Sequence, residues 1–261
     1  MRVLELQDVD VTFAARRGQD RVAALRACSL TVEQGERVAI VGRSGAGKST
    51  IARLAVGLVR PSAGAVAVLG EDMASASLRR LRDLRRRVQL VFQDPYESLH
   101  PGMRVLDLVA EPLAIVGLAR TERLGVTATA IEELGLRPAD QFLHRYPGSL
   151  SGGQRQRVAL ARTLVAGPEL ILADEPASML DASLRATVAA QLLAVQEKLG
   201  ATLVFISHDL ALARHVADRL VVLDEGRIVE DGPTEVVLAA PRHEETRLLL
   251  GAARRISTRR R

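Results

Sequence analysis

Residues 42–49 read Gly42-Arg43-Ser44-Gly45-Ala46-Gly47-Lys48-Ser49, which matches the phosphate-loop pattern G-x-x-x-x-G-K-[ST]. The apolar stretch Val38–Val41 precedes the loop, and a helix-favouring run over residues 50–58 follows it. A phosphate loop needs this order of strand, loop and helix, because the glycines let the backbone wrap the phosphates of a nucleotide. We therefore expect the Lys48 ammonium to lie among the β- and γ-phosphate oxygens and the Ser49 hydroxyl to ligate Mg²⁺.

Lys48 also stands out in the composition of the chain. Lys48 and Lys198 are the two lysines among 36 basic residues. Arginine fills the other basic positions, yet the loop keeps the compact ammonium that a planar guanidinium does not mimic. This choice is consistent with a specific role for Lys48 at the phosphates.

A second candidate phosphate site is the segment Leu150-Ser151-Gly152-Gly153-Gln154. Ser151 followed by Gln154 fits the capping box, which predicts that a helix begins here and runs to about Leu164. Two glycines in the first turn leave the backbone N–H groups accessible, and the positive end of the helix dipole favours an anion.

Two further apolar segments end in polar residues. The predicted strand 170–173 is followed by Asp174 and Glu175, and the predicted strand 202–206 is followed by Ser207, His208 and Asp209. At the carboxyl edge of a parallel sheet, Asp174 can hold Mg²⁺, Glu175 can orient the attacking water and His208 can contact a γ-phosphate. The alternatives are a solvated strand end for the two acids and a neighbour of a helix cap for the histidine.

Composition sets limits on the class of protein. A chain of 261 residues with 48% hydrophobic and 26% charged residues can bury a full core. The weakly polar stretch Val105–Leu118 is too short to span a bilayer, and Met1–Glu5 does not read as an export signal. A single cysteine, Cys28, forms no internal disulfide and fits a reducing cytoplasm.

The formal charge of +5 and the pI near 10.2 raise nucleic acid as a partner. The arginines are spread along the chain and aromatic residues are few, so we expect no nucleic-acid partner. Local arginine clusters occur at 79–87, 254–255 and 259–261. Each is read either as a solvated helix face or frayed tail, or as a contact for anionic lipid headgroups or an acidic partner.

Along the chain, short strands and helices alternate, which predicts an α/β fold with a mostly parallel sheet. Strands dominate the first 92 residues, amphipathic helical periods fill residues 94 to about 165, and strands then return. We expect a single domain, 1–261. It divides into a nucleotide-binding core (1–93 and 166–232), an inserted helical subdomain (94–165) and a short helical basic tail (233–261).

These motifs resemble those of the nucleotide-binding subunits of ATP-binding cassette (ABC) transporters over nearly the whole chain. Residues Gly42–Thr50 resemble the family's phosphate loop, Gln93 its Q-loop glutamine, residues 150–154 its signature, and residues 178–181 its D-loop, with Met179 where alanine is usual. The resemblance implies a P-loop NTPase (RecA-like) core, an N-terminal antiparallel β subdomain and the helical insertion.

The resemblance also assigns site residues. It implies that ATP and Mg²⁺ bind, with Ser49, Gln93 and Asp174 holding the metal, Glu175 and His208 acting in catalysis, and Phe13 stacking on adenine. An ordinary core phenylalanine is the alternative for Phe13. The residues implied in ATP binding are Phe13, Gly42, Arg43, Ser44, Gly45, Ala46, Gly47, Lys48, Ser49, Thr50, Gln93, Ser151, Gly152, Gly153 and Gln154.

Within the family, residues 92–101, Arg145-Tyr146-Pro147 and the tail 241–250 resemble the dipeptide, oligopeptide and nickel importer ATPases. Two segments depart from that pattern: Gly148-Ser149 replaces His-Glu before the signature, and His243-Glu244-Glu245-Thr246-Arg247 only partly matches His-Pro-Tyr-Thr-Arg. These departures weaken the prediction of a substrate and leave the prediction of ATP chemistry intact.

The resemblance implies a head-to-tail dimer in which Ser151 and Gly153 of one ATPase complete the γ-phosphate site of the other, an identical subunit or more commonly a paralogue. Two membrane permeases and, indirectly, an extracellular solute-binding protein are the further expected partners, at the cytoplasmic face of the plasma (inner) membrane. Three alternatives remain: a soluble ATPase subunit of a multienzyme complex of the phosphonate-cleaving type, an exporter ATPase, and a DNA-repair or translation ATPase. The absence of a second cassette, a long coiled-coil insertion and zinc-ligand cysteines argues against the last.

Overall fold

The computed structural model describes residues 1–13, 21–91, 99–176, 178 and 182–258. Contacts within the chain divide it into two compact units, residues 1–85 with 202–261 and residues 86–201. Gln93 and most of the D-loop segment, residues 179–181, lie outside the described residues.

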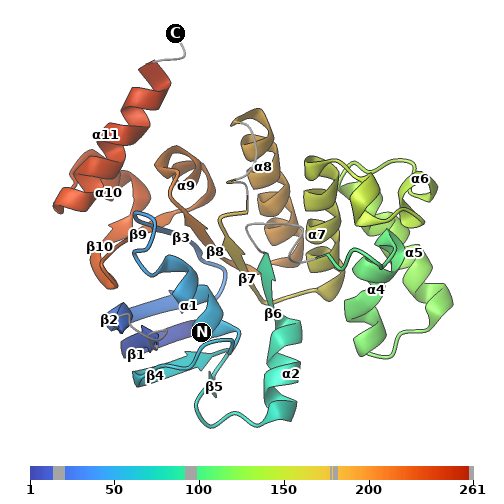
Figure 1. The fold of residues 1–261 in the computed structure, drawn as a ribbon, viewed down its shortest axis with the longest axis horizontal. Coiled ribbons are helices and arrows are strands. Elements are labelled where there is room, and N and C mark those ends of the chain that lie inside the picture. Colours follow the sequence, from blue (N-terminus) through green and yellow to red (C-terminus); the bar gives the residue numbers. More distant parts are fainter. Residues whose placement is uncertain (14–20, 92–98, 177, 179–181, 259–261) are drawn as a thin grey trace. The chain divides into compact units, whose positions relative to one another are not determined.

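The first unit begins with an antiparallel sheet in the order β2-β1-β4-β5 (Figure 1). Its strands are β1 (Arg2–Phe13), β2 (Val22–Glu33), β4 (Ala63–Val68) and β5 (Glu71–Asp72). Register shifts between Leu6 and Val9 interrupt the alternation of apolar and polar residues along β1.

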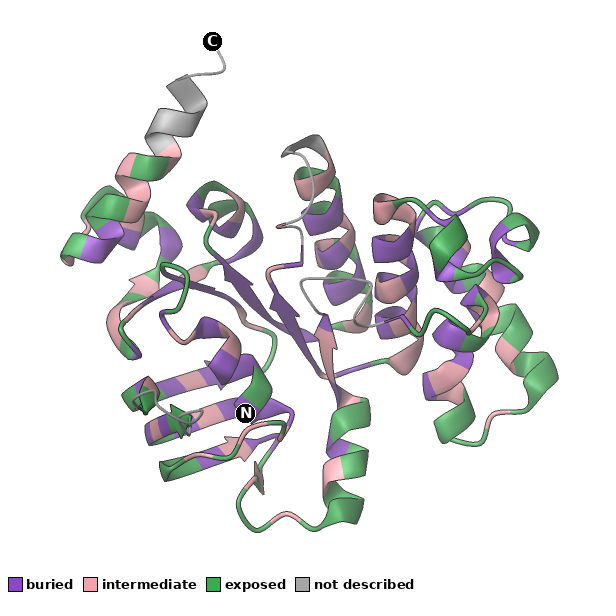
Figure 2. Cartoon of the chain, viewed as in Figure 1, coloured by how far each residue is buried: buried purple, intermediate pink, exposed green. Residues whose placement is uncertain are grey.

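A second set of strands in this unit carries the phosphate loop. The strand β3 (Arg37–Val41) runs parallel to β8 (Thr202–Ser207) and to β9 (Arg219–Asp224), and β10 (Arg227–Pro233) pairs antiparallel with β9. Strands β3, β8 and β9 are buried over most of their length (Figure 2), as expected for a sheet covered on both faces. The first unit also contains the helices α1 (Lys48–Ala55), α9 (Leu210–Val216), α10 (Thr234–Ala239) and α11 (Glu244–Thr258).

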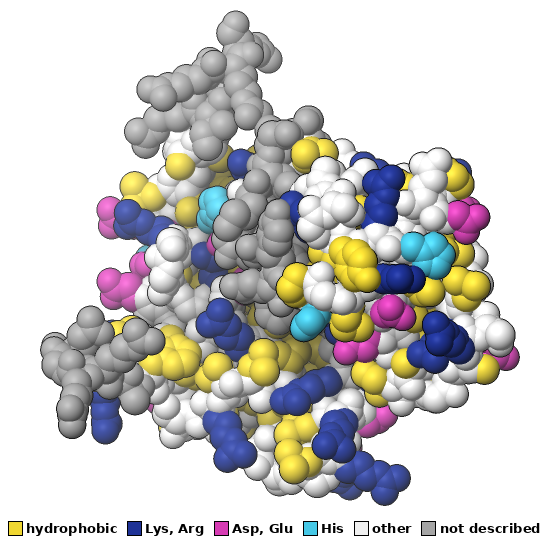
Figure 3. Space-filling view, turned by 45° about the vertical axis from the view of Figure 1, so that its right-hand side comes forward, with side chains coloured by type: hydrophobic (Ala, Val, Ile, Leu, Met, Phe, Trp, Pro, Cys, Tyr) yellow, Lys and Arg dark blue, Asp and Glu magenta, His cyan; other side chains and the backbone are white. Residues whose placement is uncertain are grey.

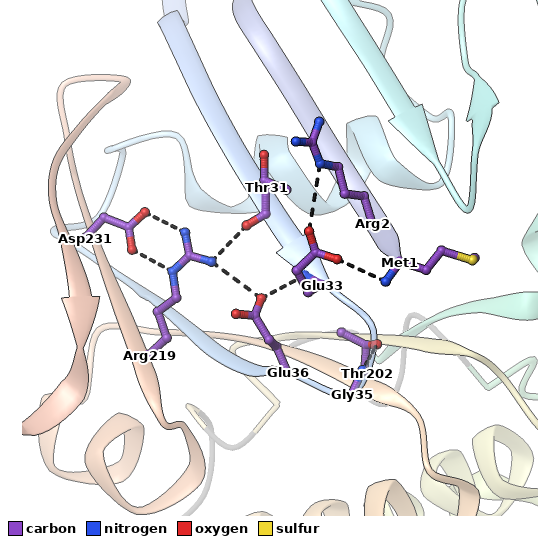
Figure 4. A network of polar contacts seen from close by, with 9 residues as sticks. All are labelled: Met1, Arg2, Thr31, Glu33, Gly35, Glu36, Thr202, Arg219 and Asp231. Atoms are coloured by element: carbon purple, nitrogen blue, oxygen red, sulfur yellow. Dashed lines mark hydrogen bonds and ion pairs between the residues drawn. The ribbon is translucent and has the colours of Figure 1, made fainter.

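Arg219 joins the two sheets of the first unit (Figure 4). From the start of β9 it donates two hydrogen bonds of 2.7 Å to the Asp231 carboxylate on β10 and one of 2.9 Å to the backbone oxygen of Thr31 on β2. The hydrogen bonds to Asp231 raise the pKa of the guanidinium. Because the pair is bidentate and partly buried, it fixes orientation as well as contributing energy.

The arginine cluster at 79–87 forms the helix α2 (Leu78–Arg87), which runs from the first unit into the second. Leu84 is its buried residue, and most of its arginines are exposed. On the face drawn in Figure 3, Lys and Arg side chains lie among hydrophobic and acidic ones. Exposed arginines are compatible with both readings of this cluster, a solvated helix face and a contact for anionic headgroups or an acidic partner.

The second unit pairs β6 (Val88–Val91) in parallel with β7 (Leu170–Asp174) and contains most of the helices. These are α4 (Val105–Ile115), α5 (Arg120–Glu133), α6 (Asp140–Leu143), the 3₁₀ turn Pro147–Ser149, α7 (Gly152–Ala166) and α8 (Ala182–Leu199). The helical periods expected within residues 94 to about 165 are confirmed by α4, α5 and α7. Among the helices of the described residues, none combines the length and hydropathy needed to cross a membrane.

Candidate nucleotide site

The phosphate loop closes around the side chain of its own lysine. Lys48 is 5% exposed, and its ammonium donates hydrogen bonds to the backbone oxygens of Gly42 at 2.8 Å and Arg43 at 2.9 Å. A backbone hydrogen bond from Ala46 N–H to the Arg43 oxygen, at 3.2 Å, closes the turn. Hydrogen bonds within the chain therefore close the loop, and the positive charge of Lys48 lies inside it.

At two positions of the loop, a residue larger than glycine would clash with neighbouring backbone. A Cβ atom on Gly42 would lie 2.2 Å from the backbone oxygen of Leu223, and one on Gly47 would lie 2.2 Å from the backbone oxygen of Ala24. Gly47 is also the N-cap of α1 and has a φ of 104°, in the region that favours glycine. The backbone of the loop can therefore pass close to its neighbours and present its N–H groups at the start of α1.

His208 lies beside the loop because of strand register. Val41 of β3 is paired with Ser207 of β8, so the next residues, Gly42 and His208, leave the same edge of the sheet together. His208 is exposed, and the following residue, Asp209, caps α9 by accepting hydrogen bonds from the N–H groups of Ala211 and Leu212. The histidine therefore neighbours a helix cap and is also adjacent to the phosphate loop, so the two readings of the sequence are compatible.

Asp174 and Glu175 end the buried strand β7 of the second unit. Asp174 is 9% exposed. Glu175 has a φ of 46°, which is uncommon for a residue that carries a Cβ atom. Backbone strain of this kind costs of order 1–3 kcal/mol and tends to occur at functional sites. Asp8, Ala27, Leu69 and Glu225 have similar φ values, so the case for Glu175 rests on its carboxylate and on its position after β7.

The capping box at the signature segment is confirmed. Ser151 Oγ accepts a hydrogen bond from Gln154 N–H at 3.2 Å, and Ser151 N–H donates to Gln154 Oε1 at 2.9 Å. The first turn of α7 holds Gly152 and Gly153, both partly exposed. The helix therefore begins where predicted, with small residues where an anion would approach.

Arg155 supports the signature segment, although no sequence motif predicted this role. This arginine is 8% exposed, and its NH1 group donates hydrogen bonds to the backbone oxygens of Pro147 and Leu150, on the turn that leads into the signature. It holds that turn against the helix. The sequence hinted at this role only through the position of Arg155 directly after the capping box. Arginine is so common in this chain that the residue type alone does not indicate a structural role.

The other residues predicted for the site lie at the end of β1 and in the first turn of α1. Phe13 ends β1 and is 40% exposed, which removes the alternative that it is a core phenylalanine. Thr50 is buried in the first turn of α1 and Ser49 is partly buried. The phosphate loop and His208 belong to the first unit, whereas Asp174, Glu175 and the signature segment belong to the second.

Comparisons with known proteins place this geometry in a family. Residues 25–178 match the family described as ABC transporter. The chain is 43% identical over 237 residues to the oligopeptide transport ATP-binding protein OppD of Mycobacterium bovis, covering 91% of this chain and 38% of that protein. It is 43% identical over 244 residues to the di/tripeptide transport ATP-binding protein DppF of Pseudomonas aeruginosa, covering 93% of this chain and 75% of that protein.

Among solved structures, the fold is similar to a dimeric ATP-binding cassette in a post-hydrolysis state bound to ADP and Pi, with a TM-score of 0.79 and 30% identity. That match covers 89% of this chain and 99% of the other. The α/β fold expected for a P-loop NTPase is thereby confirmed. The chain belongs to the ABC transporter family.

Proposed function

We propose that this protein is the ATP-hydrolysing subunit of an ABC importer that takes up peptides. The observation that carries the proposal is the 43% identity, over more than nine tenths of this chain, to transport proteins named for oligopeptides and for di- and tripeptides. The closed phosphate loop around Lys48 supports ATP as the nucleotide.

The donor set fits Mg²⁺. Ser49 supplies a hydroxyl oxygen, Asp174 a carboxylate oxygen, and Gln93, outside the described residues, an amide oxygen. Mg²⁺ prefers oxygen ligands and is usually held by one or two protein groups together with substrate phosphates, so an all-protein cage is not required. Among the described residues, no cluster of three or more His, Cys, Asp or Glu forms such a cage. Bound Mg²⁺ would neutralise charge on the β- and γ-phosphate oxygens.

The other steps of ATP binding and hydrolysis are assigned to side chains and backbone groups of this chain. Lys48 and the N–H groups at the start of α1 bind the phosphates, and Phe13, exposed at the end of β1, stacks on the adenine. Glu175 orients the attacking water and accepts its proton, while His208 contacts the γ-phosphate. Ser151 and Gly153 complete the γ-phosphate site of a second cassette in a head-to-tail dimer.

The complete transporter would pair this chain with a second ATPase, of the same or a paralogous sequence, on two permeases. We place it at the cytoplasmic face of the membrane, where a solute-binding protein acts on it indirectly. The dimeric state named for the similar solved cassette supports the paired arrangement.

Co-expression with the permeases, sister ATPase and binding protein of the same gene cluster tests the proposal. ATP hydrolysis by the purified complex should rise when the binding protein carries a peptide, and Gln93→Ala should reduce this stimulation more than it reduces ATP affinity. Stimulation by nickel in place of peptides would change the proposed solute. Recovery of the chain with cytoplasmic enzymes instead of permeases would favour the soluble multienzyme alternative.

A further inference from the structure

The helix α2 carries a positive surface that ATP binding and hydrolysis do not use. Its sequence, LRRLRDLRRR, contains six arginines and one aspartate. Most of the helix is exposed (Figure 2), and Leu84 is its buried residue. Like charges one helical turn apart destabilise a helix, so helix formation alone does not explain this composition.

One side of α2 is attached to the segment between α1 and β4. Arg85 donates hydrogen bonds from Nε to the backbone oxygen of Val56 at 3.0 Å and from NH2 to that of Gly57 at 3.3 Å. A Cβ atom on Gly57 would lie 3.5 Å from Cδ2 of Leu81, so this leucine faces the same segment. These contacts determine which side of the helix faces outward.

Two further arginines of α2 are paired with acids. Arg80 NH1 lies 3.4 Å from the Glu71 carboxylate, and Arg87 Nε donates a hydrogen bond of 2.6 Å to Glu169. Arg80 and Arg87 are about two helical turns apart, so they lie on the same side of the helix. The contacts within the chain therefore account for these two arginines and for Arg85.

Arg79 and Arg82 lie on the outward side of α2, together with Leu78. Arg82 is one turn from both Leu78 and Arg79, so the three side chains are neighbours. Leu78 is 76% exposed, and both arginines are exposed. Within the part of the chain that the structure describes, the side chains of Arg79 and Arg82 make no hydrogen bond or ion pair. On the segment that α2 contacts, Leu58 is 59% exposed as well.

An anionic lipid surface complements both components of this side of α2. Guanidinium groups form bidentate hydrogen bonds with phosphate, and a leucine beside them can enter the boundary between headgroups and acyl chains. Clusters of about four to eight basic residues on an amphipathic helix are typical of contacts with anionic lipids. An acidic protein segment would pair with the arginines but would give the exposed leucine no role.

We propose that α2 binds the anionic surface of the membrane through Arg79, Arg82 and Leu78. Such a contact goes beyond the proposed function, because it gives the chain a hold on the membrane in addition to the expected permeases. It requires neither ATP nor a permease. The purified full-length chain can therefore test it, and a negative result would leave the proposed function unaffected.

A fluorescence experiment tests the position of the contact. The chain contains no tryptophan, so a single introduced indole reports on one site. Leu78→Trp places the indole on the outward side of α2, and Ile115→Trp, at a 75% exposed position at the end of α4, is the matched control. Vesicles of phosphatidylcholine and phosphatidylglycerol in equal parts should shift the emission of Leu78→Trp to shorter wavelength. Vesicles of phosphatidylcholine alone should not, and Ile115→Trp should show no shift with either.

Sedimentation with the same vesicles measures the affinity without an added tryptophan. Arg79→Gln combined with Arg82→Gln should weaken binding about 20- to 30-fold, because each arginine near an anionic surface contributes roughly a fivefold factor. Arg26→Gln combined with Arg227→Gln removes two other exposed arginines of the first unit and lowers the net charge equally. This control should bind within about twofold of the wild type, since salt screens charges that are distant from the lipid.

Failure of the wild type to bind the anionic vesicles would overturn the inference. So would an equal loss of affinity in the two double variants, or an equal shift of the emission in Ile115→Trp, because the contact would then not be specific to α2. If the wild type does not bind vesicles but Arg79→Gln with Arg82→Gln releases the chain from the permeases, an acidic protein partner replaces the lipid.

Discussion

Lys48 reaches back across the phosphate loop and donates a hydrogen bond of 2.8 Å to the backbone oxygen of Gly42, six residues earlier. Lys48 is 5% exposed and is the first residue of α1. It stabilises the loop and is also the charge that we expect to meet the phosphates.

Replacement of Lys48 by alanine should therefore weaken ATP binding about 10- to 100-fold, because a charged donor to phosphate is lost. Lys198→Ala is the control, since it removes the other lysine of the chain from an exposed ion pair with Glu133. Calorimetric titration with Mg²⁺ and ATP measures both. An unchanged affinity for Lys48→Ala would contradict the assignment of the loop.

Glu175→Gln should separate binding from chemistry. The variant keeps the size of the side chain but removes the base, so hydrolysis should fall about 100-fold or more while ATP still binds. We expect ATP to hold this variant as a dimer in size-exclusion chromatography. Near-normal turnover together with a monomer would exclude Glu175 as the catalytic base.

Gly152→Asp places a negative charge in the first turn of α7 without removing the Ser151 cap. An acid at this position suits the helix dipole but repels phosphate. We expect hydrolysis to fall about 100-fold, while ATP affinity of the isolated chain stays at the wild-type value. Gln154→Glu, which keeps the capping box, is the control for folding of the helix. Weaker ATP binding by the monomeric Gly152→Asp variant would place this segment at the chain's own nucleotide.

Gly47→Ala should disrupt the loop more than a comparable change elsewhere. At Gly35, which has a φ of 81° and open space within 4 Å of where a Cβ atom would lie, alanine should cost roughly 1–2 kcal/mol from backbone strain alone. At Gly47 the close Ala24 oxygen adds a steric clash to that strain. Chemical denaturation and ATP titration of both variants should show a larger loss for Gly47→Ala in each measurement.

The pH dependence of stability tests the environment of Glu245. Burial and Asp224 raise its folded-state pKa above the ordinary value of 4.5, so folding favours the protonated acid. Its stabilising contribution is fully present below about pH 4.5 and is lost as the pH rises through the folded-state pKa. Denaturation of the wild type and Glu245→Gln from pH 4 to pH 7 should show Gln gaining relative stability with rising pH. A constant difference between the two proteins would contradict the raised pKa.

Sequence patterns that depend on near neighbours predicted much of this site. The phosphate-loop pattern around Lys48 and the capping box of Ser151 and Gln154 involve residues within one or two turns of each other, and both are present in the structure. The helix α8 (Ala182–Leu199) likewise follows from a composition that favours a helix over most of its length.

Other features depend on residues that are distant in sequence. His208 lies beside Gly42 because Val41 and Ser207 are in register, and Gly42 must be glycine because the backbone of Leu223 passes close to it. The burial of Glu245 follows from packing of α11 on the core. Local sequence patterns depend on hydrogen bonds and conformational preferences of residues near each other in the chain. Strand register, close contact between distant backbone segments and burial arise only when the sheet and its helices pack together and exclude water.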